Sequence, residues 1–148
     1  MSYYLGRQKF TPAALDAALH VLASASTRAA LCEVEISSGA TPVEQTGEYQ
    51  IQRTSTTGTT PAGNTTVVKR DSFSPAAGCT FGGGGYTTEP TPGDALLDIS
   101  VHQKASFRWV AYPGRELLTT PAASAGIALS VIQQSAAFSI NASCMWLE

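Results

Sequence analysis

The chain of 148 residues has the length of one domain, and a domain of this size buries about 68–70% of the surface that its unfolded chain exposes, so it needs no disulfide or metal to fold. Charged residues make up only 14% of the chain, against about 25% in typical soluble domains, and the missing charge is replaced by Ser, Thr, Ala and Gly. The formal net charge of −2 and the absence of a run of ~20 apolar residues argue against nucleic-acid and membrane partners.

Residues 1–10 carry Tyr3, Tyr4 and Phe10 without a regular period. We interpret this stretch as an extended N-terminal arm that places its aromatic side chains on a neighbouring subunit, because aromatic residues are enriched in interfaces.

Residues 11–23 fit two structures. Thr11 could cap a helix with Pro12 at its first position, and the Ala-rich composition favours a helix. Leu15, Leu19 and Val21 also fit the alternation of a strand. The arm and this open element form an N-terminal part of residues 1–26, followed by the main domain of residues 27–148.

Alternating apolar and polar residues predict short strands along the main domain. Turns and loops rich in Gly, Pro and Thr separate them, the longest at residues 54–64 and 71–93. This pattern predicts an all-β fold, an antiparallel β-sandwich of jelly-roll type. The predicted strands cover residues 31–36, 49–53, 67–68, 97–101, 107–111, 127–131 and 138–146.

The two central strands, residues 97–101 and 107–111, are joined by a short polar turn and predict a β-hairpin. Phe107 and Trp109 would place two large rings on one face of it. We therefore expect this hairpin to lie at the centre of the core, where replacing Trp109 by Ala would cost about 3–5 kcal/mol.

The glycine run at residues 82–85 does not match a phosphate-binding loop, because no Lys-Ser or Lys-Thr pair follows it. We interpret it as a flexible loop tip that either forms a second contact, through its flanking Phe81 and Tyr86, or faces the solvent. The candidate interface residues are therefore Tyr3, Tyr4, Phe10, Phe81 and Tyr86.

We predict no catalytic residue, no cofactor and no metal site. Only two histidines occur, His20 and His102, and the serines near His102 lack a nucleophile motif. The three cysteines lie outside any CxxC spacing, and we expect them to be reduced, with Cys32 and Cys144 buried in strands.

Several segments taken together resemble the small capsid decoration, or cement, proteins of tailed bacteriophages. The strongest is Arg-Trp-Val-Ala-Tyr-Pro-Gly-Arg-Glu at residues 108–116, similar to an Arg-Trp-Val-Ala-x-Pro-Gly-x-Glu core in that family. The family usually has an Asn-Gln-Arg turn before this core, where the present chain has His-Gln-Lys at residues 102–104. Weaker similarities lie at residues 27–33, 40–42, 52–59, 89–91 and 97–99.

The resemblance implies a non-enzymatic structural protein of the virion that binds the major capsid protein on the outer capsid surface and stabilises it. It also implies assembly in the host cytoplasm and self-association as a homotrimer. Two alternatives remain open: a structural protein of the tail or collar, and a carbohydrate-binding β-sandwich with an aromatic platform of Tyr86, Tyr112 and Trp146. An enzyme would require a concave pocket that contains His102 and a carboxylate.

Overall fold

The computed structural model describes residues 1–13, 15–60, 65–134 and 138–148, and these residues contain eleven β-strands and no helix. None of them therefore forms a helix that could span a membrane. The prediction of an all-β sandwich is confirmed. The strands are β1 (Tyr3–Phe10), β2 (Ala17–Leu22), β3 (Ala30–Ser38), β4 (Thr46–Thr54), β5 (Val67–Lys69), β6 (Thr80–Gly83), β7 (Pro92–His102), β8 (Phe107–Val110), β9 (Leu117–Leu118), β10 (Gly126–Gln134) and β11 (Ile140–Leu147).

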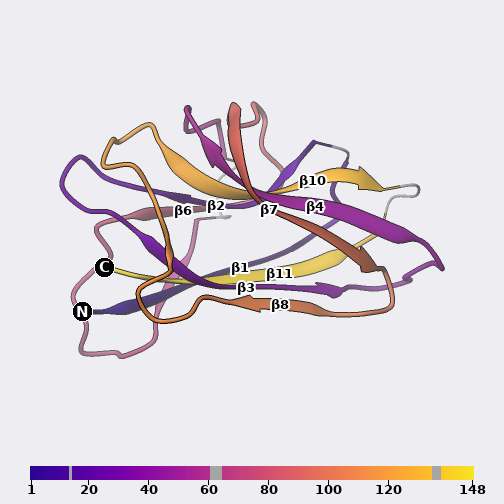
Figure 1. The fold of residues 1–148 in the computed structure, drawn as a ribbon, viewed down its shortest axis with the longest axis horizontal. Helices are drawn as coiled ribbons and strands as arrows, with labels where there is room; N and C mark the ends of the chain where they lie inside the picture. The colour runs from indigo at the N-terminus through magenta and orange to yellow at the C-terminus, as the bar shows by residue number, and fades with distance from the viewer. Residues whose placement is uncertain (14, 61–64, 135–137) are drawn as a thin grey trace.

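Two antiparallel sheets pack face to face (Figure 1). Sheet A has the strand order β5-β1-β11-β3-β8, and β9 pairs with β3 beyond the end of β8. Sheet B has the order β6-β2-β10-β4-β7. The first four strands alternate between the sheets, and so do β7, β8, β10 and β11 when the two-residue strand β9, which lies in the same sheet as β8, is set aside.

Most strands lie where the alternation predicts them. The predicted strands at residues 31–36, 49–53, 67–68, 127–131 and 138–146 correspond to β3, β4, β5, β10 and β11. The loop predicted at residues 54–64 contains an isolated bridge between Thr59 and Thr88, while its residues 61–64 lie outside the described residues.

The segment left open between helix and strand forms β2 from Ala17 onward. All six residues of β2 are buried, because Leu19 and Val21 face the core and the opposite face is covered as well. Pairing with β6 on one side and β10 on the other outweighs the helix propensity of the alanines.

The residues expected to form an N-terminal arm instead form β1, an interior strand of sheet A. It pairs with β11 from Tyr3↔Leu147 to Phe10↔Ile140, and with β5 on its other side. The boundary predicted after residue 26 is thus crossed by strand pairing, since β1 pairs with β11 and β2 pairs with β10.

The predicted central hairpin does not form. β7 pairs with β4 in sheet B and β8 pairs with β3 in sheet A, so the turn between them crosses from one sheet to the other. Phe107 and Trp109 do face the core, but they lie on an edge strand and remain half-buried.

Trp146 of β11 occupies the central position predicted for Trp109. Its side chain is fully buried, with the Tyr4 ring 6.0 Å away on one side and the Phe81 ring 6.3 Å away, measured between ring centroids. Its indole Nε1 donates to Glu148 Oε1 at 2.9 Å, which satisfies its one polar atom.

The predicted flexible glycine loop begins in β6, which pairs with β2. Phe81 and the three glycines after it are buried. A Cβ on Gly84 would collide with the ring of Phe10, and one on Gly83 would approach the side chain of Gln8. The glycines therefore let β6 pack closely against the side chains of β1.

We expect Trp146→Ala to lower the free energy of unfolding by about 3–5 kcal/mol, since it removes a fully buried ring. The same change at the half-buried Trp109 should cost only about 1–2 kcal/mol in dilute protein. Chemical denaturation followed by circular dichroism measures both, and equal losses would contradict this account of the core.

Candidate functional site

The five predicted interface residues do not form one surface. Tyr4 and Phe81 are buried in the core of the chain, so they offer no surface to a partner. Tyr3 is exposed at one end of β1 beneath the guanidinium of Arg70, 5.6 Å from its ring centroid. Phe10, at the other end of β1, and Tyr86 are half-buried.

The aromatic platform of the carbohydrate-binding alternative is not present. Tyr112 is 80% exposed, but Trp146 is fully buried and Tyr86 is half-buried with its hydroxyl oxygen inaccessible to solvent. A sugar ring could not stack on all three side chains together.

His102 lies exposed at the end of β7. Its Nδ1 accepts a hydrogen bond from the backbone N–H of Lys104 at 3.3 Å. Within the described ranges, no group of three or more His, Cys, Asp or Glu side chains could hold a metal ion.

The three cysteines have free thiols. Cys144 and Cys79 are buried and Cys32 is half-buried. Burial raises the pKa of Cys144 to about 12, and burial together with Glu148 raises the pKa of Cys79 to about 12. Both thiols are therefore protonated at neutral pH and are poor nucleophiles.

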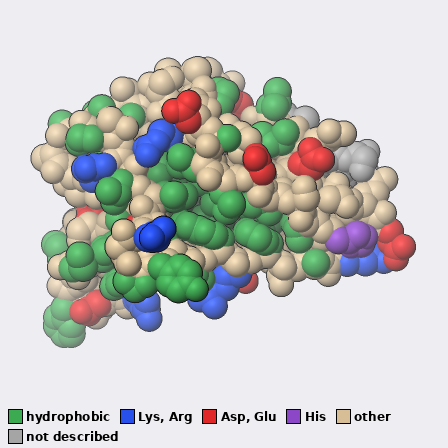
Figure 2. All heavy atoms as spheres, in the orientation of Figure 1, with side chains coloured by type: hydrophobic (Ala, Val, Ile, Leu, Met, Phe, Trp, Pro, Cys, Tyr) green, Lys and Arg blue, Asp and Glu red, His purple; other side chains and the backbone are tan. Residues whose placement is uncertain are grey.

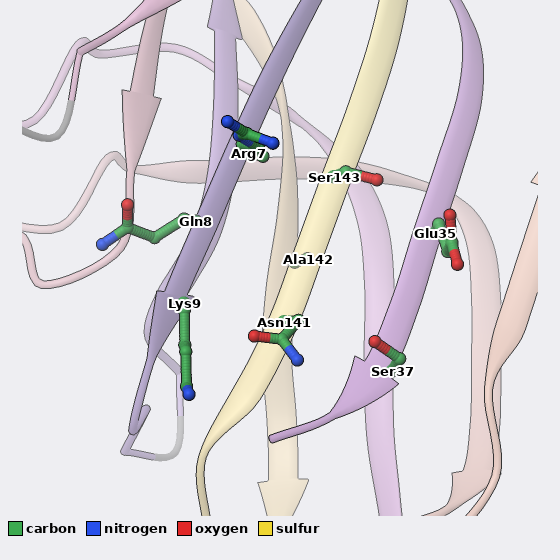
Figure 3. A pocket seen from close by; sticks show the side chains of 8 residues that line it. All are labelled: Arg7, Gln8, Lys9, Glu35, Ser37, Asn141, Ala142 and Ser143. Atoms are coloured by element: carbon green, nitrogen blue, oxygen red, sulfur yellow. The ribbon is translucent and has the colours of Figure 1, made fainter. Parts of the chain in front are cut away.

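A shallow groove of about 510 Å³ crosses the outer face of sheet A over β1, β11 and β3 (Figure 3). All three are interior strands of the sheet, so neighbouring strands already bond their backbone groups. Recognition in this groove must therefore use side chains. The lining residues are Arg7, Gln8, Lys9, Glu35, Ser37, Asn141, Ala142 and Ser143.

The strand register arranges the groove in two rows. Arg7, Ser143 and Glu35 are neighbours across the three strands, and Arg108 of β8 continues this row. Lys9, Asn141 and Ser37 form the next row in the same way. We refer to these seven residues as the polar face.

Two cations of the polar face are free to meet a partner. In the part of the chain that the structure describes, Arg7 and Lys9 form no ion pair. Arg108, in contrast, donates from Nε to Glu33 Oε1 at 2.7 Å, and this contact raises its pKa. Besides the exposed carboxylate of Glu35, the polar face thus offers two unpaired cations, hydroxyl groups and an amide. This combination suits a protein surface that presents carboxylates and other hydrogen-bond acceptors.

Sequence reasoning missed the polar face because residues 1–10 were interpreted as an arm. The signal was present in the alternation of Arg7 and Lys9 with Gly6, Gln8 and Phe10. Its strand partners Asn141 and Ser143 lie far away in the sequence, so the sequence alone did not bring them together.

On the opposite side of the molecule, His20 of β2 is buried on the outer face of sheet B. Its Nε2 lies 2.7 Å from Thr54 Oγ1, and the ring of Tyr86 lies 6.2 Å away between centroids. Burial lowers the pKa of His20 to about 4, and the backbone of Thr57 only partly offsets this effect. The neutral imidazole is therefore a structural element of this sheet face.

The depressed pKa of His20 predicts loss of stability in mild acid. The unfolded chain takes up this proton below about pH 6.5, whereas the folded chain does so only near pH 4. The neutral His20 therefore contributes its full stabilisation above about pH 6.5, and this contribution falls as the pH is lowered further. We expect His20 to account for a loss of roughly 2 kcal/mol between pH 7 and pH 5, measured by urea denaturation at each pH.

His20→Gln is the control, because an amide can still bond Thr54 but does not titrate. We expect the variant to lose most of this pH dependence. An unchanged dependence on pH would assign it to other groups.

Comparison with known proteins gives no relative: no protein-family model, no curated protein and no solved structure matches this chain. The similarity to phage decoration proteins therefore stays a prediction from the sequence.

Proposed function

We propose that this chain is a non-enzymatic structural protein of a tailed-bacteriophage virion that binds the outer surface of the capsid as a cement or decoration protein. In this proposal the chain assembles in the host cytoplasm, associates with itself as a homotrimer and binds the major capsid protein. It uses no cofactor.

The sequence similarity at residues 108–116 and the strand order support this proposal together. In the order β1-β11-β3-β8 over β2-β10-β4-β7, consecutive strands lie in opposite sheets, as in a jelly roll of eight strands. A jelly-roll fold is the fold that the sequence resemblance implies, although a fold alone does not determine a function.

The observation that carries the proposal is the polar face. Six of its seven residues lie on three interior strands whose backbone groups are paired on both sides, so the surface is regular, and Arg108 extends it onto the edge strand β8. Its cations Arg7 and Lys9 are exposed and form no ion pair among the described residues. Such a surface suits a stabilising protein, because it can hold a partner by many modest polar contacts. We assign the polar face to an acidic patch of the coat protein.

The direct test is to search for the chain in purified virions by mass spectrometry and to locate its density on the particle by cryo-electron microscopy. We expect density on the outer surface of the head, with the polar face toward the coat protein. Density on the tail or collar would contradict the capsid assignment, and absence from the particle would contradict the proposal as a whole.

The double variant Arg7→Glu, Lys9→Glu should weaken binding to particles that lack the protein by about tenfold or more, since it reverses the two unpaired cations of the polar face. The double variant Lys69→Glu, Lys104→Glu is the control, because it changes the net charge by the same amount at two exposed cations outside the polar face. Cosedimentation with particles measures the affinities. An equal loss of affinity in both variants would show that only the net charge of the protein affects binding, and would contradict the role of the polar face.

A further inference from the structure

The two sheets end at the same side of the molecule. β7 is the last strand of sheet B and β8 is the last strand of sheet A, so in the described structure each leaves one edge unpaired. A short turn joins them, and they run in opposite directions along this side (Figure 1).

An apolar surface opens between these two edges. Six of the nine partly buried hydrophobic residues that the structure places against the core belong to β7, β8 or β9. Figure 2 shows hydrophobic side chains gathered in the centre of this side of the molecule, between the two sheets. We call this surface the seam. It consists of Leu96, Leu97, Val101, Phe107, Trp109 and Leu117.

An unpaired edge beside apolar surface is a place where proteins aggregate unless it is protected or covered. β7 has eleven residues, and its charged side chains are Asp94 and Asp98. Its Pro92 protects only the first position of the strand. The seam therefore requires a cover that supplies both apolar surface and strand edges.

We propose that the seam is covered by the seam of a second copy of this chain. If the copies are related by a rotation axis parallel to β7 and β8, β7 of one copy lies antiparallel beside β8 of the next. The free edges then face each other, and the half-buried rings of Phe107 and Trp109 meet at the axis. Such an axis gives a closed ring of two or three copies.

The charges beside the seam fit this arrangement. Asp94 and Asp98 lie on β7, and Asp98 accepts a hydrogen bond from Gln50. The segment after β8 carries Arg115, whose side chain forms no ion pair within the described residues, and Glu116, whose carboxylate accepts a hydrogen bond from the backbone N–H of Gly114. Rotation about the proposed axis places the β7 side of one copy against the β8 side of the next, so acidic and basic groups meet. The inference rests on the proposed self-association and identifies its surface.

The two tryptophans permit a test on the unmodified protein. Trp146 is fully buried in one chain, so acrylamide should quench mainly the fluorescence of the half-buried Trp109. We expect sedimentation to show a discrete oligomer and quenching to fall about threefold or more as it forms. A monomer at all concentrations, a polydisperse aggregate, or an oligomer with unchanged quenching would overturn the inference.

A matched pair of variants locates the contact. Val101→Lys places a charge in the seam, and Val68→Lys makes the same change at a valine of β5 that is 43% exposed on another edge. We expect the first to raise the dissociation constant of the oligomer by about 100-fold or more and the second to leave it unchanged. The reverse pattern would contradict the seam. If Val101→Lys does not fold, as judged by circular dichroism, the quenching of Trp109 in the unmodified protein decides whether the seam is covered in the oligomer.

Particle binding separates this inference from the proposed function. A wild-type monomer that still binds particles would overturn the seam and leave the capsid assignment intact. An oligomer with protected Trp109 that does not bind particles would support the seam and contradict the capsid assignment.

Discussion

The pairing of β1 with β11 is the interaction on which the rest of the structure depends. It joins the first and last strands over eight residue pairs, and reciprocal backbone hydrogen bonds of 3.0 Å between Ser2 and Glu148 extend it. On the inner face, the pairing stacks Tyr4 on Trp146 and so builds the centre of the core. On the outer face, the same register places Arg7 beside Ser143 and so creates the polar face. One register therefore determines both packing and the candidate site.

The sandwich presents two surfaces of opposite character. The outer face of sheet A is polar, and its interior strands have no free backbone groups, so a partner there meets only side chains. The β7–β8 side is apolar and has free strand edges, so a partner there can bury hydrophobic area and pair its backbone. Apolar surfaces are typical of permanent contacts between subunits, whereas polar surfaces are typical of contacts between partners that fold separately. The two surfaces can thus serve different partners at once.

The sequence was informative about strands and less so about their partners. Alternation identified β11 because Ile140, Ala142, Cys144 and Trp146 all face the core. The signal for β1 was weaker, because Gly6 occupies an inward position where an apolar side chain would mark the buried face, and Phe81 fills that space instead. Alternation also misplaced the glycine run, because close packing of β6 against β1 depends on pairs that are distant in the sequence. Local pattern reports which face of a strand is buried, whereas the partner strand is set by long-range packing.

The failed hairpin and the seam have the same physical origin. Two alternating strands with a short turn between them form a hairpin only if both stay in one sheet. Here the four residues between His102 and Phe107 carry the chain across the sandwich, so neither strand covers the edge of the other. The inward side chains of β7 and β8 then meet only across the gap between the sheets, and those nearest the edge remain partly exposed. A chain that turns from one sheet to the other at its outermost strands leaves this side open, and this opening is the structural basis of the contact that we propose there.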